Sequence, residues 1–452
     1  MNPTFLLINP WIHDFAAYDL WSKPLGLLCL SGTLRRLGFH IQLIDCLDVH
    51  HPMMQARYPN GSPRRRRYGT GKFWRQPISP PPALGGVPRA YSRYGITPDI
   101  FVEQLTRAGP PDAILVTSLM TYWYPGVQEV IRLAKKVYPA VPVILGGIYA
   151  RLCGHHARRH LEADAVVDAS DPHALLDVLG ACGIRPPGSD GGSRFHPYPA
   201  FDLLTRRDYV CIMTSTGCPY GCKYCASRFL NPVFQQRDPE DVLEEILYWH
   251  RVFRVRDFAF YDDALLVDPD RHIMPLLEAL VRLDLKVRFH TPNAMHVKEI
   301  TREMAVLMRR CGFKTVRLGL ETWDASPRRE LDRKISEGDY ERAVTALSKA
   351  GYGPHEIGTY ILMGLPGQAV DSVMKTIDFV ARWGAVPYLS EYSPIPHTAL
   401  WEAAVRSSPF DLVKEPLFHN NTLLPCWDPL KKEKVPLLKK RVQAVRRKYR
   451  PS

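Results

Sequence analysis

The sequence predicts an α/β protein: a Rossmann-like, doubly wound parallel sheet, then a partial (β/α)6 TIM barrel, then a short C-terminal helical tail. Short apolar runs alternate with segments of helical spacing along most of the chain. These runs are nearly continuous, which is typical of parallel strands covered by helices on both faces. A Pro- and Gly-rich stretch at 186–199 has linker composition and separates two such series.

A chain of 452 residues is too long for a single ordinary core. We therefore expect a Rossmann-like domain at 1–190, a barrel domain at 200–410 and a C-terminal extension at 411–452. The first domain contains an insert at 49–98 that is rich in Pro and Arg.

The first series predicts a parallel sheet with a ligand-binding edge. Its expected strands are 5–10, 40–48, 113–118, 141–147 and 163–169, and its clearest helices are 24–38 and 127–139. Ligands of doubly wound sheets bind at the carboxyl ends of the strands. The residues expected at those ends are Asn9, Asp45, Ser118, Gly146 and Gly147.

The net charge of +13 is concentrated in two segments. Residues 57–98 hold nine Lys or Arg and no acid, and residues 431–452 hold ten Lys or Arg and one acid. Such blocks bind anionic partners or nucleic acid, or they are simply a solvated linker and a solvated helix. The insert is too long and irregular for an ordinary connection, so we interpret it as a functional excursion or a partly mobile loop.

The second series predicts six strand–helix units, which fit a barrel or partial barrel. Its expected strands are 209–215, 258–263, 286–293, 315–322, 358–364 and 386–393. Helices are expected at 239–253, with Asp238 as the N-cap, and at 339–351. From about residue 411 the pattern decays into loops and then a basic helix.

Targeting signals and disulfides are not expected. The chain has no run of about 18 apolar residues, so no membrane span is predicted. Its start lacks a basic n-region and a cleavage site and reads as a first strand, not a signal peptide. Ten cysteines without a secretion signal do not suggest a disulfide scaffold, and we expect the protein in the reducing cytoplasm.

Three cysteines carry the strongest chemical signal. Cys218, Cys222 and Cys225 form CxxxCxxC directly after the first strand of the second series. Thiolates are soft ligands that suit zinc or iron–sulfur clusters. A closed site usually has four protein ligands, whereas this loop supplies three, which would leave one iron of a cluster open. The alternative is a structural zinc site with a distant fourth ligand.

This motif, with Tyr224 before the last cysteine, resembles the radical S-adenosylmethionine (SAM) superfamily. The resemblance implies a 4Fe-4S cluster whose open iron is chelated by the amino and carboxylate groups of SAM. An electron from the reduced cluster would cleave SAM into methionine and a 5′-deoxyadenosyl radical. It also implies an electron donor such as flavodoxin or ferredoxin, and a small-molecule or peptide substrate that the sequence does not identify.

The resemblance extends over about residues 205–402 and assigns further cofactor-binding residues to strand ends. Carboxylates at the end of the second strand suit the ammonium group of methionine. Glycines near the fifth strand would let the backbone approach adenine. The implied cofactor-binding residues are Tyr224, Asp262, Asp263, Asn293, Glu321, Gly364 and Pro366. The acids could instead be helix caps or solvated groups, and Gly364 and Pro366 could form only a turn. His397 stands where the sixth-strand segment of the family usually has Gly.

Residues 1–50 and 110–180 resemble the cobalamin (vitamin B12)-binding-type domain that precedes many radical SAM barrels. The chain has Asn9-Pro10 where a DxHxxG motif would follow the first strand. Asp48-Val49-His50 matches half of that motif after the second strand, which we take as coincidence. Because relatives can bind cobalamin without a histidine ligand, cobalamin is a candidate cofactor; the alternative is a domain that has lost it and covers the barrel.

The sequence thus predicts a radical SAM enzyme, with cobalamin-dependent methyl transfer to an unactivated carbon as the leading reaction. A second hypothesis is an RNA-modifying enzyme similar to the methylthiotransferases, because of the basic segments; nucleic acid is therefore a considered but not a favoured partner. A third is a non-catalytic iron–sulfur or metal-binding module. Catalytic residues other than the cofactor ligands are not identified.

Overall fold

The computed structural model describes residues 2–169, 173–187, 198–323, 335 and 338–449. It divides into two compact units, Met1–Arg207 and Asp208–Ser452, and each is described here by itself. The linker expected at 186–199 falls mostly outside the described residues. The domain limits placed at 190 and 200 therefore stay predictions.

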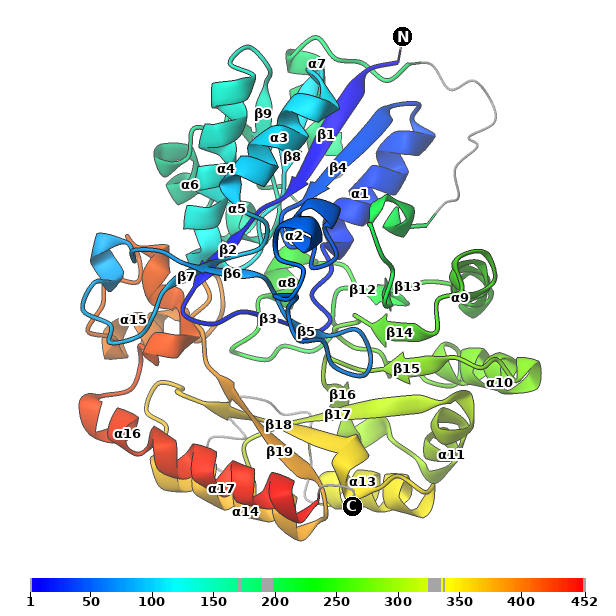
Figure 1. Ribbon diagram of the computed structural model, residues 1–452. Coiled ribbons are helices and arrows are strands. Elements are labelled where there is room, and N and C mark those ends of the chain that lie inside the picture. The colour runs from blue at the N-terminus through cyan, green and yellow to red at the C-terminus, as the bar shows by residue number, and fades with distance from the viewer. Residues whose placement is uncertain (1, 170–172, 188–197, 324–334, 336–337, 450–452) are drawn as a thin grey trace. The chain divides into compact units, whose positions relative to one another are not determined.

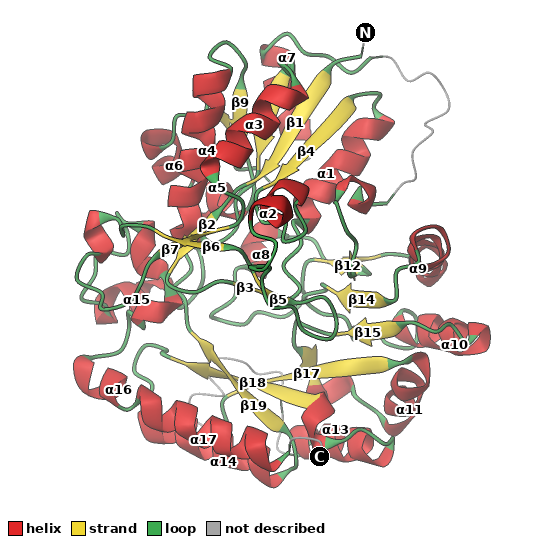
Figure 2. Cartoon of the chain, in the orientation of Figure 1, coloured by secondary structure: helices red, strands yellow, loops and turns green. Residues whose placement is uncertain are grey.

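The first unit is built on a parallel sheet of five strands in the order β10-β9-β8-β1-β4, as far as the described residues show (Figures 1 and 2). Its strands are β1 Thr4–Asn9, β4 His40–Asp45, β8 Ala113–Val116, β9 Val143–Leu145 and β10 Ala165–Val166. Its helices are α1 Leu25–Arg36, α3 Pro98–Ala108, α4 Tyr124–Val137, α5 Ile148–Leu152, α6 Gly154–His160 and α7 His173–Ala181, with the short 3-10 turns η2 Thr121–Trp123 and η3 Phe201–Leu203. The predicted doubly wound sheet is confirmed.

Alternate residues of β1 explain why helices cover both faces of this sheet. Leu6 and Ile8 pack in the cluster that contains α3 and α4, whereas Phe5 and Leu7 pack in the cluster that contains α1 and α7. All four side chains are fully buried. A central strand buried on both faces has no polar positions, which is why its sequence is a continuous apolar run.

The basic insert is folded against the first unit. It forms α2 Pro52–Arg57, β5 Gly71–Lys72, β6 Arg75–Pro77, η1 Pro82–Leu84 and β7 Ser92–Tyr94. Strand β7 pairs with β6 and with β2 Ile12–Asp14, and β5 pairs with β3 Tyr18–Asp19. The aromatic residues Phe73, Trp74, Tyr91 and Tyr94 are buried. The sequence did not reveal these pairs because the strands have two or three residues and their partners lie far away in the chain.

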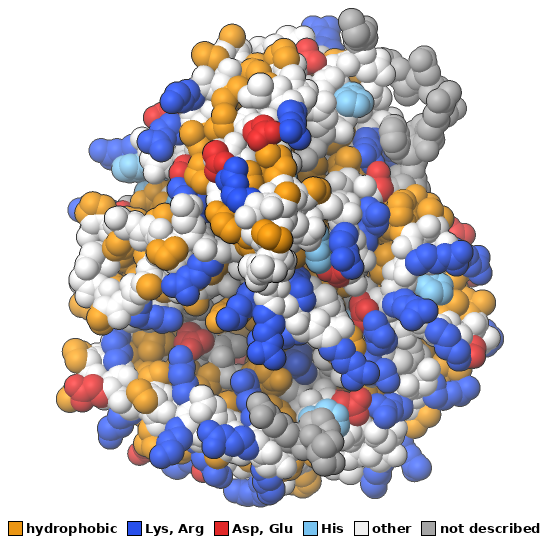
Figure 3. Space-filling model, viewed as in Figure 1, with side chains coloured by type: hydrophobic (Ala, Val, Ile, Leu, Met, Phe, Trp, Pro, Cys, Tyr) orange, Lys and Arg blue, Asp and Glu red, His pale blue; other side chains and the backbone are white. Residues whose placement is uncertain are grey.

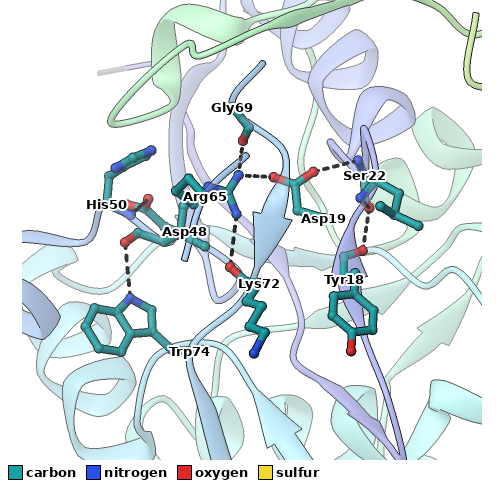
Figure 4. Close-up of polar contacts among 11 residues, drawn as sticks. Tyr18, Asp19, Ser22, Asp48, His50, Arg65, Gly69, Lys72 and Trp74 are labelled. Atoms are coloured by element: carbon teal, nitrogen blue, oxygen red, sulfur yellow. Dashed lines mark hydrogen bonds and ion pairs between the residues drawn. The ribbon is translucent and has the colours of Figure 1, made fainter. Parts of the chain in front are cut away.

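An ion pair fastens the insert to the loop after β1 (Figure 4). Arg65, within the run of four arginines, donates to the buried carboxylate of Asp19 and to the carbonyl oxygens of Gly69 and Lys72. Its three neighbours in the run are exposed. Figure 4 also shows the Asp48-Val49-His50 segment, where the His50 amide donates to Asp48 Oδ1 at 2.8 Å, so this half-motif forms a local turn.

The second unit contains the six predicted strands in one parallel order, β11-β14-β15-β17-β18-β19 (Figure 1). They are β11 Val210–Ile212, β14 Asp257–Phe260, β15 Arg288–His290, β17 Phe313–Glu321, β18 Ile357–Met363 and β19 Val386–Glu391. Sequential parallel order with intervening helices is the topology of a partial (β/α)6 barrel, so that prediction is confirmed. The structure adds a short strand that the sequence did not reveal, β16 Met295–His296, which pairs with β17.

The helices and turns of this unit follow the predicted spacing. They are α8 Ser227–Leu230, α9 Pro239–Phe253, α10 Ile273–Leu283, η4 Val297–Glu299, α11 Arg302–Cys311, α13 Asp339–Lys349, η5 Pro354–Glu356, α14 Val370–Arg382, α15 Trp401–Ser407, η6 Pro416–His419, η7 Asn421–Leu423, α16 Pro429–Glu433 and α17 Val435–Lys448. Asp238 caps α9 as predicted, because its Oδ1 accepts from the Glu240 amide at 2.8 Å.

The basic tail forms α17, which packs onto the second unit. Leu438, Val442 and Val445 are buried on one side of the helix. Arg441 pairs with Asp378 of α14 at 2.7 Å, and the guanidinium of Arg446 lies 4.2 Å from the ring centre of Tyr388 in β19. On the face drawn in Figure 3, Lys and Arg side chains are scattered and do not gather in one patch. The apolar side of α17 is therefore part of the second unit's packing, and its basic residues are largely exposed.

No helix in the part of the chain that the structure describes is both long and apolar enough to cross a bilayer. The compartment stays a prediction.

Glu129 of α4 provides a test of how the insert is attached. Its carboxylate accepts from Arg93 of β7 and lies 3.1 Å from His13 Nε2 of β2. Burial alone would raise the pKa of Glu129, but the contacts with His13 and Arg93 lower it from 4.5 to about 2. Ionised Glu129 therefore links two elements that lie far apart in the sequence.

We predict that Glu129→Gln destabilises the protein at pH 7 by about 1–2 kcal/mol, since the pKa is depressed in a partly screened site. A depressed pKa contributes stability that is fully present above about pH 4.5 and is lost as the pH falls toward 2. Urea denaturation at several pH values should show the wild type and the variant converging as the pH falls from about 4.5 toward 2. A difference that is constant with pH would contradict this assignment.

Candidate functional site

The carboxyl ends of the second unit's strands surround a cavity of about 340 Å³. Seven of the predicted site residues line it: Cys218, Cys222, Cys225, Tyr224, Asp263, Asn293 and Glu321. Asp262, Gly364 and Pro366 do not line it. The wall also includes Tyr220, Pro292, Ala294, Met295, His296, Gly319, Ile335 and Tyr360, which sequence reasoning missed. The strand β16, which has no sequence signal of its own, brings Met295 and His296 into the wall.

Backbone pairing closes the cysteine loop at its base. Strand β12 Ser215–Thr216 runs antiparallel to β13 Gln235–Gln236, so the chain between them leaves and returns at one place. Gly217 follows with φ +73°, and a Cβ there would lie 2.5 Å from the carbonyl oxygen of Val233. Only glycine fits this position. The loop is also held at Lys223, whose carbonyl oxygen accepts from the amide of Leu400, just before α15, at 3.0 Å.

The three cysteines differ from most others in the chain by their exposure. Cys218 and Cys222 are partly exposed and Cys225 is exposed, in the wall of one cavity. Burial raises the pKa of Cys153 and Cys311 to about 12 and that of Cys426 to about 11, which keeps those residues as thiols. The loop cysteines, in contrast, are accessible from the cavity that they line.

The donor set of this cavity fits an iron–sulfur cluster with an open position. Three sulfur donors come from one loop, and the remaining wall offers oxygen donors and aromatic rings. Among the described side chains, no three His, Cys, Asp or Glu residues form a group that could hold a single metal ion. The cluster assignment therefore rests on the loop spacing and the shared cavity.

The two adjacent acids after β14 have different surroundings. Asp263 lines the cavity, and its carboxylate accepts from the Ser227 hydroxyl. Asp262 is buried, and its Oδ1 accepts four hydrogen bonds from the backbone and side chains of Thr214 and Ser215. Burial raises the pKa of Asp262 to about 6, with these hydrogen bonds opposing the effect. The sequence could not separate the two residues, because both follow the same strand.

A bulge directs Glu321 into the cavity. The register of β17 against β18 shifts between Gly319 and Glu321, and Glu321 has φ +58°. The Tyr224 hydroxyl donates to Glu321 Oε1 at 2.8 Å, which joins the cysteine loop to the end of β17. Asn293 donates to the Tyr261 carbonyl oxygen at 2.8 Å, which joins the ends of β14 and β15. The polar strand-end residues thus hold one another in place around the cavity.

The segment after β18 forms a tight turn. Gly364 has φ +99°, and its amide donates to Gln368 Oε1 at 2.9 Å, as does the Leu365 amide at 3.2 Å. A Cβ at Gly364 would lie 2.9 Å from Leu424 Cδ2. These contacts support the turn interpretation of Gly364 and Pro366, and an approach of this backbone to adenine stays a prediction.

His397 keeps the backbone conformation that glycine would adopt. Its φ is +66°, in the left-handed region, and its ring stacks on Phe229 with centroids 4.0 Å apart and an interplanar angle of 5°. A non-glycine residue in this region is strained by about 1 kcal/mol, which a stacked aromatic pair is able to offset. The departure from the family pattern therefore does not abolish the turn.

The first unit has a separate, larger cavity of about 590 Å³. Its wall is mostly apolar and comes from α1, β8, β9 and α7, with Thr117, Gly146 and Gly147 at the strand ends. Gly147 has φ +94°, and a Cβ there would lie 2.3 Å from the Ser118 carbonyl oxygen. The cavity thus lies against one face of the sheet and reaches the carboxyl ends of β8 and β9, next to which doubly wound sheets bind ligands.

Comparison with known proteins finds a family-model match within each unit. Residues 212–380 match the family model of the radical SAM superfamily, and residues 91–179 match that of the B12 binding domain. An uncharacterised methyltransferase of Pyrococcus horikoshii is 27% identical over 68% of this chain and 72% of its own length. Cytidylyl-2-hydroxyethylphosphonate methyltransferase of Streptomyces wedmorensis is 21% identical over 84% of this chain and 77% of its own length.

A solved structure shows the same fold. The radical SAM methyltransferase TsrM from Kitasatospora setae, with cobalamin and a [4Fe-4S] cluster bound, has a TM-score of 0.63 at 16% identity. The similarity covers 90% of this chain and 79% of that one. At this identity the likeness establishes the fold.

We predict that His397→Ala destabilises the second unit more than His397→Gly, by about 1 kcal/mol. Both variants lose the stack on Phe229, but only alanine keeps the cost of the left-handed backbone. Thermal or urea denaturation of the two variants measures the difference. Phe229→Ala, which removes the stack without changing the backbone at 397, is the control; equal stability of the two His397 variants would contradict the strain argument.

Proposed function

We propose that this chain, which carries a radical SAM domain and a B12-binding domain, is a cobalamin-dependent radical SAM methyltransferase that methylates an unactivated carbon. The observation that carries the proposal is the loop with Cys218, Cys222 and Cys225 in the wall of a cavity at the carboxyl ends of the barrel strands. Three thiolates leave one position of a 4Fe-4S cluster open for SAM.

The residues of the cavity take separate roles in this proposal. When bound, the cluster supplies the electron that cleaves SAM reductively, and cobalamin carries the methyl group. Cys218, Cys222 and Cys225 hold the cluster. The carboxylate of Asp263 suits the ammonium group of SAM's methionine moiety. Glu321 lines the cavity and is held in place by the Tyr224 hydroxyl.

Aromatic side chains narrow the cavity on the side of β16. The rings of Tyr220 and His296 lie 4.3 Å apart, and the Tyr360 hydroxyl donates to the Pro292 carbonyl oxygen at 2.8 Å. In this proposal these residues form the part of the wall beside which substrate or cofactor binds.

The apolar cavity of the first unit supports cobalamin binding. A cavity of about 590 Å³ is large enough to bury a sizeable apolar part of a cofactor. Cobalamin is bound in the TsrM structure, and two relatives of this chain are named methyltransferases. The absence of DxHxxG from the sequence implies that no histidine of that motif binds the cobalt.

The finer assignments rest on the same proposal. We infer a small-molecule or peptide substrate, and a protein electron donor such as flavodoxin or ferredoxin, in the cytoplasm. RNA modification has no specific support, because the insert and α17 use their apolar residues, and some of their basic residues, in packing and ion pairs.

We predict that Cys218→Ala, and likewise alanine at 222 or 225, abolishes both cluster binding and SAM cleavage. Anaerobic reconstitution with iron and sulfide, followed by iron analysis and assays for 5′-deoxyadenosine and methionine, measures both. Cys182→Ala, which removes an exposed cysteine outside the cavity, should behave as wild type. Wild-type protein that holds zinc with a fourth protein ligand, and leaves SAM intact, would contradict the proposal.

We predict that Gly26→Trp weakens cobalamin binding by at least about tenfold, because it places a large side chain in the cavity wall. Gly26 lies on α1, lines the cavity and has open space at its Cβ position. Gly180 of α7 also has open space but lies outside the cavity wall, so Gly180→Trp is the matched control. Absorbance titration with cobalamin measures affinity; equal affinity in both variants would exclude this cavity.

A further inference from the structure

Asp262 contacts the residues that immediately precede the cysteine loop. It lies two residues after the end of β14, whereas its hydrogen-bond partners Thr214 and Ser215 lie two and three residues after the end of the neighbouring strand β11. Asp262 is 3% exposed, Thr214 is fully buried and Ser215 is 2% exposed. Two residues separate Ser215 from Cys218 in the sequence. A shift of this short segment would therefore shift the first ligand of the cluster.

One carboxylate oxygen receives all four hydrogen bonds. Asp262 Oδ1 accepts from the amide and hydroxyl of Thr214 at 2.9 and 2.7 Å, and from the amide and hydroxyl of Ser215 at 2.6 and 2.7 Å. Hydrogen bonds to an ionised acceptor are short and about twice as strong as neutral ones. Oδ2 has no hydrogen-bond partner in the described part of the chain. Asp262 therefore bonds to the chain that enters the cysteine loop, and it does not line the cavity.

Two further residues, His272 and Arg237, also contact the segment that contains Thr214. His272 is buried, and its Nε2 lies 2.7 Å from Thr214 Oγ1. Because the Thr214 hydroxyl donates its hydrogen to Asp262, its oxygen accepts from His272, which places a proton on Nε2. Arg237 holds the carbonyl oxygens of Met213 and Thr214 at 2.8 Å each, and pairs with the buried Glu245 at 2.6 Å.

The neighbouring acid reaches the other end of the loop. Asp263 accepts from the hydroxyl of Ser227, two residues after Cys225, and it also lines the cavity. The two consecutive carboxylates thus meet the chain before the first cysteine and after the last one.

We propose that Asp262 is a positioning residue: its carboxylate holds Thr214 and Ser215, and through them places Cys218 for the cluster, while Asp263 alone faces the cofactor cavity. The inference rests on the proposed function, because it assumes that the cysteine loop binds a cluster. Removing a residue that orients a metal ligand through a hydrogen bond typically lowers metal affinity or activity about 10- to 100-fold. Asp262 would act in this way through the backbone that carries the ligand.

The experiment compares Asp262→Asn with the matched control Asp263→Asn in the full-length protein. In the apo protein, the rate of Cys218 alkylation by iodoacetamide, mapped by mass spectrometry and normalised to Cys182, reports the position of the loop. After anaerobic reconstitution, iron content and the EPR spectrum of the reduced cluster report the cluster itself. The effect of each substitution on the KM for SAM is then compared with its effect on kcat.

For Asp262→Asn we expect faster alkylation of Cys218, a loss of bound iron or an altered EPR spectrum, and a kcat lower by about tenfold with little change in the KM for SAM. For Asp263→Asn we expect alkylation as in the wild type and a KM for SAM raised by about tenfold. Wild-type alkylation and EPR spectrum in Asp262→Asn, together with a raised KM for SAM, would overturn the proposal and make Asp262 a SAM ligand.

Ser215→Ala keeps the test decisive if Asp262→Asn does not fold. This variant removes one of the four donors and leaves the carboxylate in place, so Cys218 alkylation should rise by a smaller factor. Unchanged alkylation in a folded Ser215→Ala protein would count against the proposal. The alkylation assay uses apo protein, so it tests Asp262 even if the wild type assembles no cluster, a result that would refute only the proposed function.

Discussion

Parallel strand pairing is the constraint on which the candidate site depends. In the second unit the six barrel strands run in one direction, so their carboxyl ends meet at one rim. Residues as distant in sequence as Cys218 and Tyr360 therefore line one cavity. The strands themselves are held by apolar burial, and polar residues just beyond them, some of them buried, form the site.

The residues at the strand ends of the second unit are joined by hydrogen bonds. Tyr224 bonds to Glu321, Asn293 to the carbonyl oxygen of Tyr261, and Asp262 to the chain that enters the cysteine loop. Polar contacts from the ends of β14 and β17 thus fix the cysteine loop, and Asn293 joins the ends of β14 and β15. Buried polar groups need such partners, because an unpaired one costs about 1–3 kcal/mol. The same contacts that satisfy the polar groups also set the geometry of the site.

The first unit has the same kind of contact between strand ends, but its cavity differs from that of the second unit. Its strand-end residues also bond to one another, as in the 2.7 Å contact from Asn9 to Asp45. The hollow space, however, lies against an apolar face, between the sheet and the helices α1 and α7. The cavity of the second unit is lined by three cysteines and two carboxylates, whereas that of the first unit is larger and lacks cysteine and carboxylate clusters; this difference agrees with the two family matches.

The sequence by itself determined the two α/β series, the six barrel strands, the N-cap at Asp238 and the three-cysteine loop, because these depend on local periodicity and spacing. Tertiary structure alone decided which of two adjacent acids faces the cavity, since Asp262 and Asp263 differ only in what packs against them. It also decided that the insert pairs with the loop after β1, that β16 adds His296 to the site, and that His397 replaces glycine by stacking on Phe229. Contacts between residues distant in the chain leave no periodic trace in the sequence, and for that physical reason only the folded chain shows them.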